Sequence, residues 1–203
     1  MSYLTAHPAG VLTLLLQHLL IVASGLVLSV AIAIPLGVLV NRVRVLELPV
    51  MLATGLMYLI PSLALFAFLI PFTGLGTRTA IAAQVVYSLL VIVRNTAAGL
   101  RAVPDSVQEA ATGTGLTAIQ RLWLVEFPMA LPIILGGVRV AAVMGVGIAS
   151  VAAYVGAGGL GTLVFRGIAT VDGDLILAGT LPIVALALSI DAVLRMAESS
   201  LSR

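Results

Sequence analysis

The chain has 203 residues, of which 61% are hydrophobic and 9% charged, and its formal net charge is +2. A soluble domain of this composition would have too little polar surface, so we expect an all-α integral membrane protein that crosses the lipid bilayer several times. All ten basic residues are scattered arginines, there is no cysteine, and His7 and His18 are the only histidines, so we expect neither a nucleic-acid partner nor a metal site.

The first apolar run covers residues 12–40 and ends at Asn41-Arg42-Val43-Arg44. It is far longer than the apolar core of a signal peptide, and no lysine or arginine precedes it. We therefore expect a retained membrane span, although Ala31-Ile32-Ala33 resembles a cleavage site.

The second apolar run, residues 49–71, is interrupted by Ile60-Pro61-Ser62. Because proline removes a backbone hydrogen bond, this span should kink or break near the middle of the membrane. Residues 72–79 contain two glycines and predict a turn, and a third span is expected over residues 80–100.

The one long polar interval of the chain covers residues 104–128. Ser106 lies three residues before Glu109, which is the spacing of a capping box and predicts a short helix beginning there. Gly113 and Gly115 then supply the permissive backbone that ends a helix and reverses the chain.

Thr117 and Gln120 repeat the capping-box spacing, so a second short helix is expected after the reversal. This helix should stop before Pro128, because proline cannot continue the hydrogen-bond ladder of a helix. Spacing alone leaves open the alternative that the interval is an ordinary amphipathic loop between two spans.

The fourth span, residues 131–154, carries small side chains at every fourth position: Gly137, Ala141, Gly145, Ala149 and Ala153. Small residues let helices approach closely within lipid, so we expect this span to be buried among other helices. Residues 156–161 are rich in glycine and should break it, residues 162–170 could form a short re-entrant or surface helix, and the last span should cover residues 175–196.

Five spans place the two termini on opposite sides of the membrane. If the polar interval is cytoplasmic, seven arginines lie inside and two outside, which fits the positive-inside rule. The inner set is Arg42, Arg44, Arg94, Arg101, Arg121, Arg195 and Arg203, and the outer set is Arg78 and Arg166. We therefore expect the N-terminus outside and the C-terminus inside.

The polar interval resembles the loop of permease subunits in bacterial ATP-binding-cassette importers of the type I, methionine-permease-like fold. The resemblance lies in Glu109-Ala110-Ala111, in Gly115 six positions after the glutamate, and in Pro128 thirteen positions after that glycine. The usual Ile-x-Leu-Pro ending is altered to Val125-Glu126-Phe127-Pro128 with its spacing intact.

Four further segments resemble the osmoprotectant branch of these permeases: Ile60-Pro61-Ser62-Leu63-Ala64, Arg94-Asn95-Thr96, Ala130-Leu131-Pro132 and Tyr154-Val-Gly-Ala-Gly-Gly-Leu-Gly161. The likeness covers nearly the whole chain and implies one transmembrane domain over residues 1–203. It also implies a quaternary-ammonium cargo such as glycine betaine, choline or carnitine. A permease for another small solute, such as an amino acid, is the alternative.

The resemblance implies that Glu109, Ala110 and Ala111 form a docking helix on a cytoplasmic ATPase, with Gly115 at the reversal and Pro128 at the start of the fourth span. It implies three partners in the bacterial inner membrane system: ATPase subunits, a second permease copy or paralogue, and an extracytoplasmic substrate-binding protein. The chain has no phosphate-binding Gly-Lys loop and no lysine, so ATP and Mg²⁺ should bind the partner ATPase, and we expect no enzyme activity here.

A quaternary ammonium group is held by the faces of aromatic rings. We expect the translocation path to be lined by five residues: Ser62, Tyr87, Asn95, Met144 and Tyr154. The alternative is that the tyrosines lie in the interfacial aromatic belt and Asn95 caps a helix end.

Two other classes of membrane protein fit the sequence less well. A secondary carrier should show a buried ionisable residue and an internal repeat of spans, but the acids lie at span ends and His18 stands alone in the first span. An intramembrane hydrolase would need a nucleophile with its base, and no Gly-x-Ser-x-Gly motif occurs.

Overall fold

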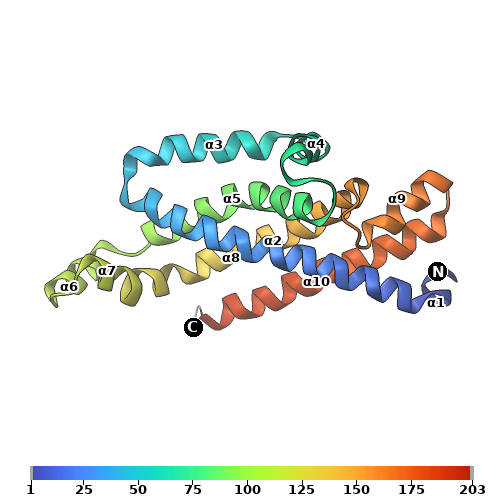
Figure 1. Ribbon diagram of the computed structural model, residues 1–203. Helices are drawn as coiled ribbons and strands as arrows, with labels where there is room; N and C mark the ends of the chain where they lie inside the picture. Colours follow the sequence, from blue (N-terminus) through green and yellow to red (C-terminus); the bar gives the residue numbers. More distant parts are fainter. Residues whose placement is uncertain (1, 202–203) are drawn as a thin grey trace.

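The computed structural model describes residues 2–201, and within them it contains helices and connecting turns without a β-strand (Figure 1). The α-helices are α1 (Ser2–Ala6), α2 (Pro8–Arg42), α3 (Glu47–Leu59), α4 (Ser62–Thr73), α5 (Thr77–Arg101), α6 (Asp105–Gly113), α7 (Ala118–Arg121), α8 (Phe127–Ala152), α9 (Gly161–Thr170) and α10 (Gly173–Leu201). Two 3₁₀ turns, Arg44–Leu46 and Ala153–Val155, and a π turn, Leu122–Glu126, complete the set.

Four helical segments within the described residues are long and apolar enough to cross a membrane: Pro8–Arg42, Thr77–Arg101, Ala118–Val155 and Gly173–Ser200. The bent pair formed by α3 and α4 raises the number to five if it counts as one span. The expectation of an all-helical membrane protein with about five spans is therefore confirmed. Which terminus faces the cytoplasm stays a prediction.

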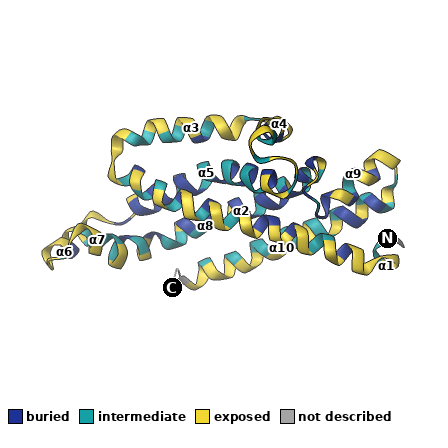
Figure 2. Ribbon diagram, in the orientation of Figure 1, coloured by how far each residue is buried: buried dark blue, intermediate teal, exposed yellow. Residues whose placement is uncertain are grey.

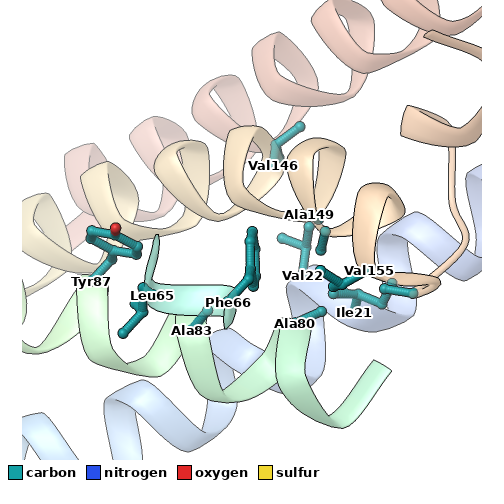
Figure 3. Packing of buried hydrophobic residues seen from close by; sticks show 12 residues of the cluster. Ile21, Val22, Leu65, Phe66, Ala80, Ala83, Tyr87, Val146, Ala149 and Val155 are labelled. Atoms are coloured by element: carbon teal, nitrogen blue, oxygen red, sulfur yellow. The ribbon is translucent and has the colours of Figure 1, made fainter. Parts of the chain in front are cut away.

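The second expected span is broken more sharply than a kink. The segments Arg44–Leu59 and Ser62–Thr73 meet at an angle of 104° at Pro61, which is extended with φ −57° and ψ 139°. Proline disfavours helical geometry in the residue before it, and Ile60 is accordingly extended as well. The expected break is confirmed, and α4 packs Leu65 and Phe66 into the core (Figure 3).

The core of the bundle lies where α2, α5 and α8 pack together, with α10 against α8 and α9 (Figures 1 and 2). On α8, Gly137, Ala141, Gly145 and Ala149 are buried, and Ala153, which begins the following 3₁₀ turn, is half-buried. The expectation that the small-residue span lies among other helices is therefore confirmed. As expected, the helix is followed by a glycine turn, in which Gly156, Gly158 and Gly159 all have positive φ.

Polar side chains from α5 fit into the spaces left by glycines on its neighbours. Gln84 is fully buried between Gly25 of α2 and Gly145 of α8, where an added Cβ would lie 2.5 Å from its amide group on either side. Its Nε2 donates a hydrogen bond of 2.9 Å to the carbonyl of Val22 on α2. One amide thus joins three helices at the centre of the membrane-spanning bundle.

A second close approach between α2 and α5 lies further along the two helices from Gln84, at Gly37 and Thr96. A Cβ added at Gly37 of α2 would lie 2.5 Å from the Cβ of Thr96 on α5 and 3.0 Å from the carbonyl oxygen of Val93. Neither atom can move away by a side-chain rotation, because one is a Cβ and the other is backbone. The α2–α5 contact therefore requires glycine at this position.

We predict that Gly37→Ala lowers the free energy of unfolding by about 1–3 kcal/mol, the usual cost of overpacking a core. Gly55→Ala is the matched control, since a Cβ there meets nothing within 4 Å, and alanine favours helix over glycine. Thermal unfolding of the purified chains in detergent, followed by circular dichroism, measures the difference. Equal midpoints for the two variants would contradict the prediction.

The charges of α8 and α10 are paired across the bundle. Arg139 of α8 lies 3.1 Å from a carboxylate oxygen of Glu198 and 3.5 Å from one of Asp191, both on α10. Asp191 also binds Arg195 one turn further along α10 at 2.6 Å. A charge within a span is costly when unpaired, so these contacts fix α10 against α8 at this end.

Candidate functional site

The polar interval forms two short helices, but the first begins differently from the expectation. α6 starts at Asp105 behind an extended Pro104, and no side chain caps its first turn. The expected Ser106–Glu109 capping box is therefore wrong. Pro104 holds the backbone in the extended geometry that precedes a helix, so the helix begins two residues too early for Ser106 to act as its cap.

The reversal and the second capping box agree with the expectation. Gly115 has a φ of +84°, a left-handed conformation that favours glycine. Thr117 Oγ1 accepts a hydrogen bond from the Gln120 amide at 3.3 Å, and Gln120 Oε1 accepts one from the Thr117 amide at 2.9 Å. The capping box at the start of α7 is thereby confirmed.

The second short helix does not stop before Pro128, and this expectation is wrong. α7, the π turn and α8 form one continuous helix over Ala118–Val155. The amide of Phe127 donates to the carbonyl of Leu122, five residues back, instead of four. The π turn thus absorbs the position where Pro128 has no amide to donate, and the helix continues through it.

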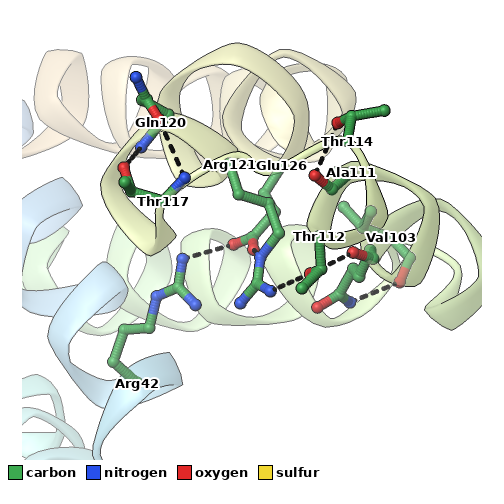
Figure 4. Close-up of polar contacts among 10 residues, drawn as sticks. Arg42, Val103, Ala111, Thr112, Thr114, Thr117, Gln120, Arg121 and Glu126 are labelled. Carbon is green, nitrogen blue, oxygen red and sulfur yellow. Dashed lines mark hydrogen bonds and ion pairs between the residues drawn. The ribbon is translucent and has the colours of Figure 1, made fainter.

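Glu126 is a residue whose role the sequence did not reveal. It is 2% exposed, and each of its carboxylate oxygens binds an arginine at 2.8 Å: Oε2 binds Arg42 Nη2 and Oε1 binds Arg121 Nε (Figure 4). Arg121 Nη1 also donates to Thr112 Oγ1 of α6 at 2.8 Å. The only signal in the sequence was an isolated acid in an otherwise apolar stretch.

The π turn explains why Arg121 and Glu126 meet. In an α-helix, residues five apart lie about 140° away from each other around the axis. In a π turn the hydrogen bonds run from i to i+5, so residues five apart lie on one face. The helix distortion before Pro128 and the ion pair of Glu126 are therefore parts of one local structure.

The first short helix presents a polar groove. It is lined by Asp105, Gln108, Glu109, Thr112, Gly113 and Arg121. Glu109 and Ala110 are exposed, whereas Ala111 is buried against the loop. Beyond the groove, the large apolar side chains of Ile119 and Trp123 are exposed as well. This end of the molecule therefore offers both polar and apolar groups to a partner.

A cavity of about 430 Å³ lies beside the break at Pro61. Its lining comes from four segments of the chain: Tyr58, Ile60, Ser62, Tyr87, Met144, Gly147, Ile148 and Val151. The Tyr87 hydroxyl donates a hydrogen bond to the carbonyl of Ile60. The ring of Tyr87 lies 6.1 Å from that of Tyr58, edge to face at 79°.

The structure brings three of the five residues expected along the path into this cavity, namely Ser62, Tyr87 and Met144. Asn95 lies two turns further along α5, where its Nδ2 donates to the Val91 carbonyl at 2.8 Å. Tyr154 lies in the 3₁₀ turn that follows α8, 69% exposed, with its ring 5.6 Å from that of Phe165. Tyr58 also lines the cavity, and sequence analysis did not single it out.

No group of three or more His, Asp or Glu side chains within residues 2–201 is arranged to hold a metal ion. The cavity lining likewise contains no charged side chain. Its chemistry is that of aromatic rings, a thioether and single hydroxyl groups.

Comparison with known proteins connects this geometry to a family. The model of the family described as "Binding-protein-dependent transport system inner membrane component" matches residues 14–203. The osmoprotectant import permease protein OsmW of Salmonella typhimurium strain LT2 is 44% identical over 197 residues, covering 95% of this chain and 92% of that protein. The carnitine transport permease protein OpuCB of Listeria monocytogenes is 40% identical over 186 residues, covering 92% of this chain and 85% of that protein.

Solved structures of the MetNI methionine ABC transporter in inward-facing conformations share the fold. One chain superposes with a TM-score of 0.84 at 23% identity, covering 92% of this chain and 94% of its own. Another gives 0.86 at 22% identity, covering 98% and 99%. The protein is therefore a member of the family of inner-membrane components of binding-protein-dependent transport systems, with the fold of a type I importer permease.

Proposed function

We propose that this permease carries a quaternary-ammonium osmoprotectant, such as glycine betaine, choline or carnitine, in an ATP-driven importer. The observation that carries the proposal is the identity of 44% and 40%, over most of both chains, to permeases named for osmoprotectants and carnitine. A choline transport system permease protein, OpuBB of Bacillus subtilis, is 37% identical over 92% of this chain.

The chemistry of the cavity supports this choice of cargo. A quaternary ammonium group cannot donate a hydrogen bond, and the face of an aromatic ring attracts it by about 0.5–2 kcal/mol. Tyr58 and Tyr87 supply two rings beside an uncharged lining. Such a cavity holds the cargo weakly, which suits a passage that must release it.

We place the cavity residues Ser62, Tyr87 and Met144 at the middle of the path. Asn95 lies further along α5 and Tyr154 lies in the turn after α8, so we assign them to the stretches of the path on either side of the cavity. High affinity is then left to an extracytoplasmic substrate-binding protein, the partner that the family description implies.

The same proposal gives α6 and α7 the role of a docking element for a partner ATPase, which binds ATP and Mg²⁺. The two helices lie at one end of the molecule, toward which the C-terminus also points, whereas the N-terminus lies at the other end with α9 (Figure 1). Together with the arginine distribution, this supports a cytoplasmic docking element and C-terminus and an outer N-terminus. A second permease copy or paralogue completes the proposed assembly.

Uptake measurements test the cargo directly. Vesicles that contain the permease, its ATPase and its binding protein, with ATP inside, should accumulate radiolabelled glycine betaine, choline or carnitine. Methionine is the matched negative control, because the solved structures with this fold belong to a methionine transporter. Accumulation of methionine without any quaternary-ammonium compound would contradict the proposed cargo.

The aromatic cavity gives a second prediction. Tyr58→Ala or Tyr87→Ala should lower uptake roughly 5- to 30-fold, because each removes about 1–2 kcal/mol of ring contact with the cation. Tyr87→Phe keeps the ring and loses only the hydrogen bond to Ile60, so its uptake should stay within about threefold of wild type. Phe72→Ala, an aromatic deletion outside the cavity where the side chain is 75% exposed, is the control. Wild-type uptake by both alanine variants would exclude this path.

The docking element gives a third prediction. Glu109 is exposed and its side chain makes no hydrogen bond or ion pair within residues 2–201, so Glu109→Arg should leave the unfolding temperature of the purified permease unchanged. The reversed charge should instead weaken binding to the ATPase and lower uptake at least tenfold. Co-purification of the ATPase and uptake by vesicles measure the two effects. Full uptake by the Glu109→Arg variant would contradict the docking role and leave residues 104–128 as an ordinary loop between two spans.

A further inference from the structure

We infer that Arg42, Glu126 and Arg121 form a joint through which movement of the docking helices reaches α2 as well as α8. The inference rests on the proposed function, because it assigns a positioning role within the coupling of ATP hydrolysis to transport. Thr112 extends the joint to α6, and the four residues together are called the Glu126 cluster (Figure 4).

The Glu126 cluster lies where three parts of the chain meet. Glu126 ends the π turn that precedes α8, Arg121 ends α7, and Arg42 is the last residue of α2. Thr112 lies in the last turn of α6. One buried carboxylate is therefore bound to the ends of two helices and, through Arg121, to a third.

The docking helices are joined by the backbone to α5, through residues 102–104, and to α8, but not to α2. α7 continues into α8 as one helix, so α8 follows any movement of α7 through its own backbone. α6 packs chiefly against α7 and the π turn, while α2 packs chiefly against α5 and α8. The hydrogen-bonded ion pair between Arg42 and Glu126 therefore supplies a direct link from the docking helices to α2.

The chemistry of the cluster favours a stiff link. Arginine presents planar, fixed donors to a carboxylate, and charge-assisted hydrogen bonds of this kind are short and strong. Because Glu126 is 2% exposed, little water competes with the arginines for its carboxylate oxygens. The exposed pair of Arg101 and Glu47 at the same end of the bundle lacks this burial, with side chains 42% and 39% exposed.

The test uses Glu126→Gln in the assembled importer. The amide keeps the size of the side chain and one acceptor oxygen, so it can bind one arginine but not both. The molecules of cargo taken up per ATP hydrolysed should fall at least fivefold, while assembly with the ATPase persists. Glu47→Gln removes a charge from the exposed ion pair and should keep the wild-type ratio.

A distance measurement separates a positioning role from a merely structural one. The chain has no cysteine, so spin labels can be placed at will. Labels at Val45, which is 77% exposed beyond α2, and at Ser106 on α6 report whether the two move together. Their distance distribution should stay narrow through ATP binding in the wild type and broaden in E126Q. A second label pair at Ser106 and Met129, within the α6–α8 unit, should be unchanged in both.

Three outcomes decide the inference. A lower transport ratio with a broadened distribution between the labels at Val45 and Ser106 supports it. If the wild-type complex transports cargo and E126Q keeps both the wild-type transport ratio and the narrow distance distribution, the inference is overturned and the proposed function stands. A wild-type complex that assembles and transports no cargo overturns the proposed function, and with it the coupling role of Glu126.

Discussion

Gln84 shows the constraint on which this bundle depends. Within lipid, apolar side chains gain little by packing against each other, so helices associate through close approach and polar contacts. The glycines at 25 and 145 allow α2 and α8 to approach α5, and the amide of Gln84 fills the space between them and binds a backbone carbonyl. Thr96 against Gly37 and Asn95 against Gly137 repeat the arrangement toward the docking end. These contacts fix α2, α5 and α8 against each other, and the residues of the cavity and of the Glu126 cluster project from these helices or from the segments that adjoin them.

The sites themselves lie where helices depart from regular geometry. The cavity follows the break at Pro61, and its Tyr87 hydroxyl satisfies a carbonyl beside that break. The ion pairs of Glu126 follow the π turn that accommodates Pro128. Irregular backbone within a membrane protein is tolerated where protein groups or a water-filled space surround it. Both irregularities meet that condition, and each aims side chains in directions that a straight helix would not provide.

Local chemistry made much of this structure predictable from the sequence. Pro61, Gly115 and the Thr117–Gln120 spacing act on their immediate neighbours, and all three behave as expected. Predictions failed where a neighbouring residue changed the register, as Pro104 did for Ser106. Tyr58 and Glu126 escaped detection because their partners come from other segments of the chain. Tyr58 meets Tyr87 where α3 packs against α5, and the π turn aligns residues five apart, which helical periodicity would separate.

The π turn also sets the rotational phase between the docking helix and the membrane span. Its five-residue hydrogen bond accommodates one residue more than a regular turn of the same continuous helix would. The extra residue is taken up without turning α7 relative to α8, so the buried stripe of α8 and the exposed face of α7 keep their directions. Loss of a single residue between 122 and 126 would close this turn to regular four-residue bonding and bring the ring of Pro128 against the carbonyl four residues before it. The five-residue turn thus lets one continuous helix pass through a proline.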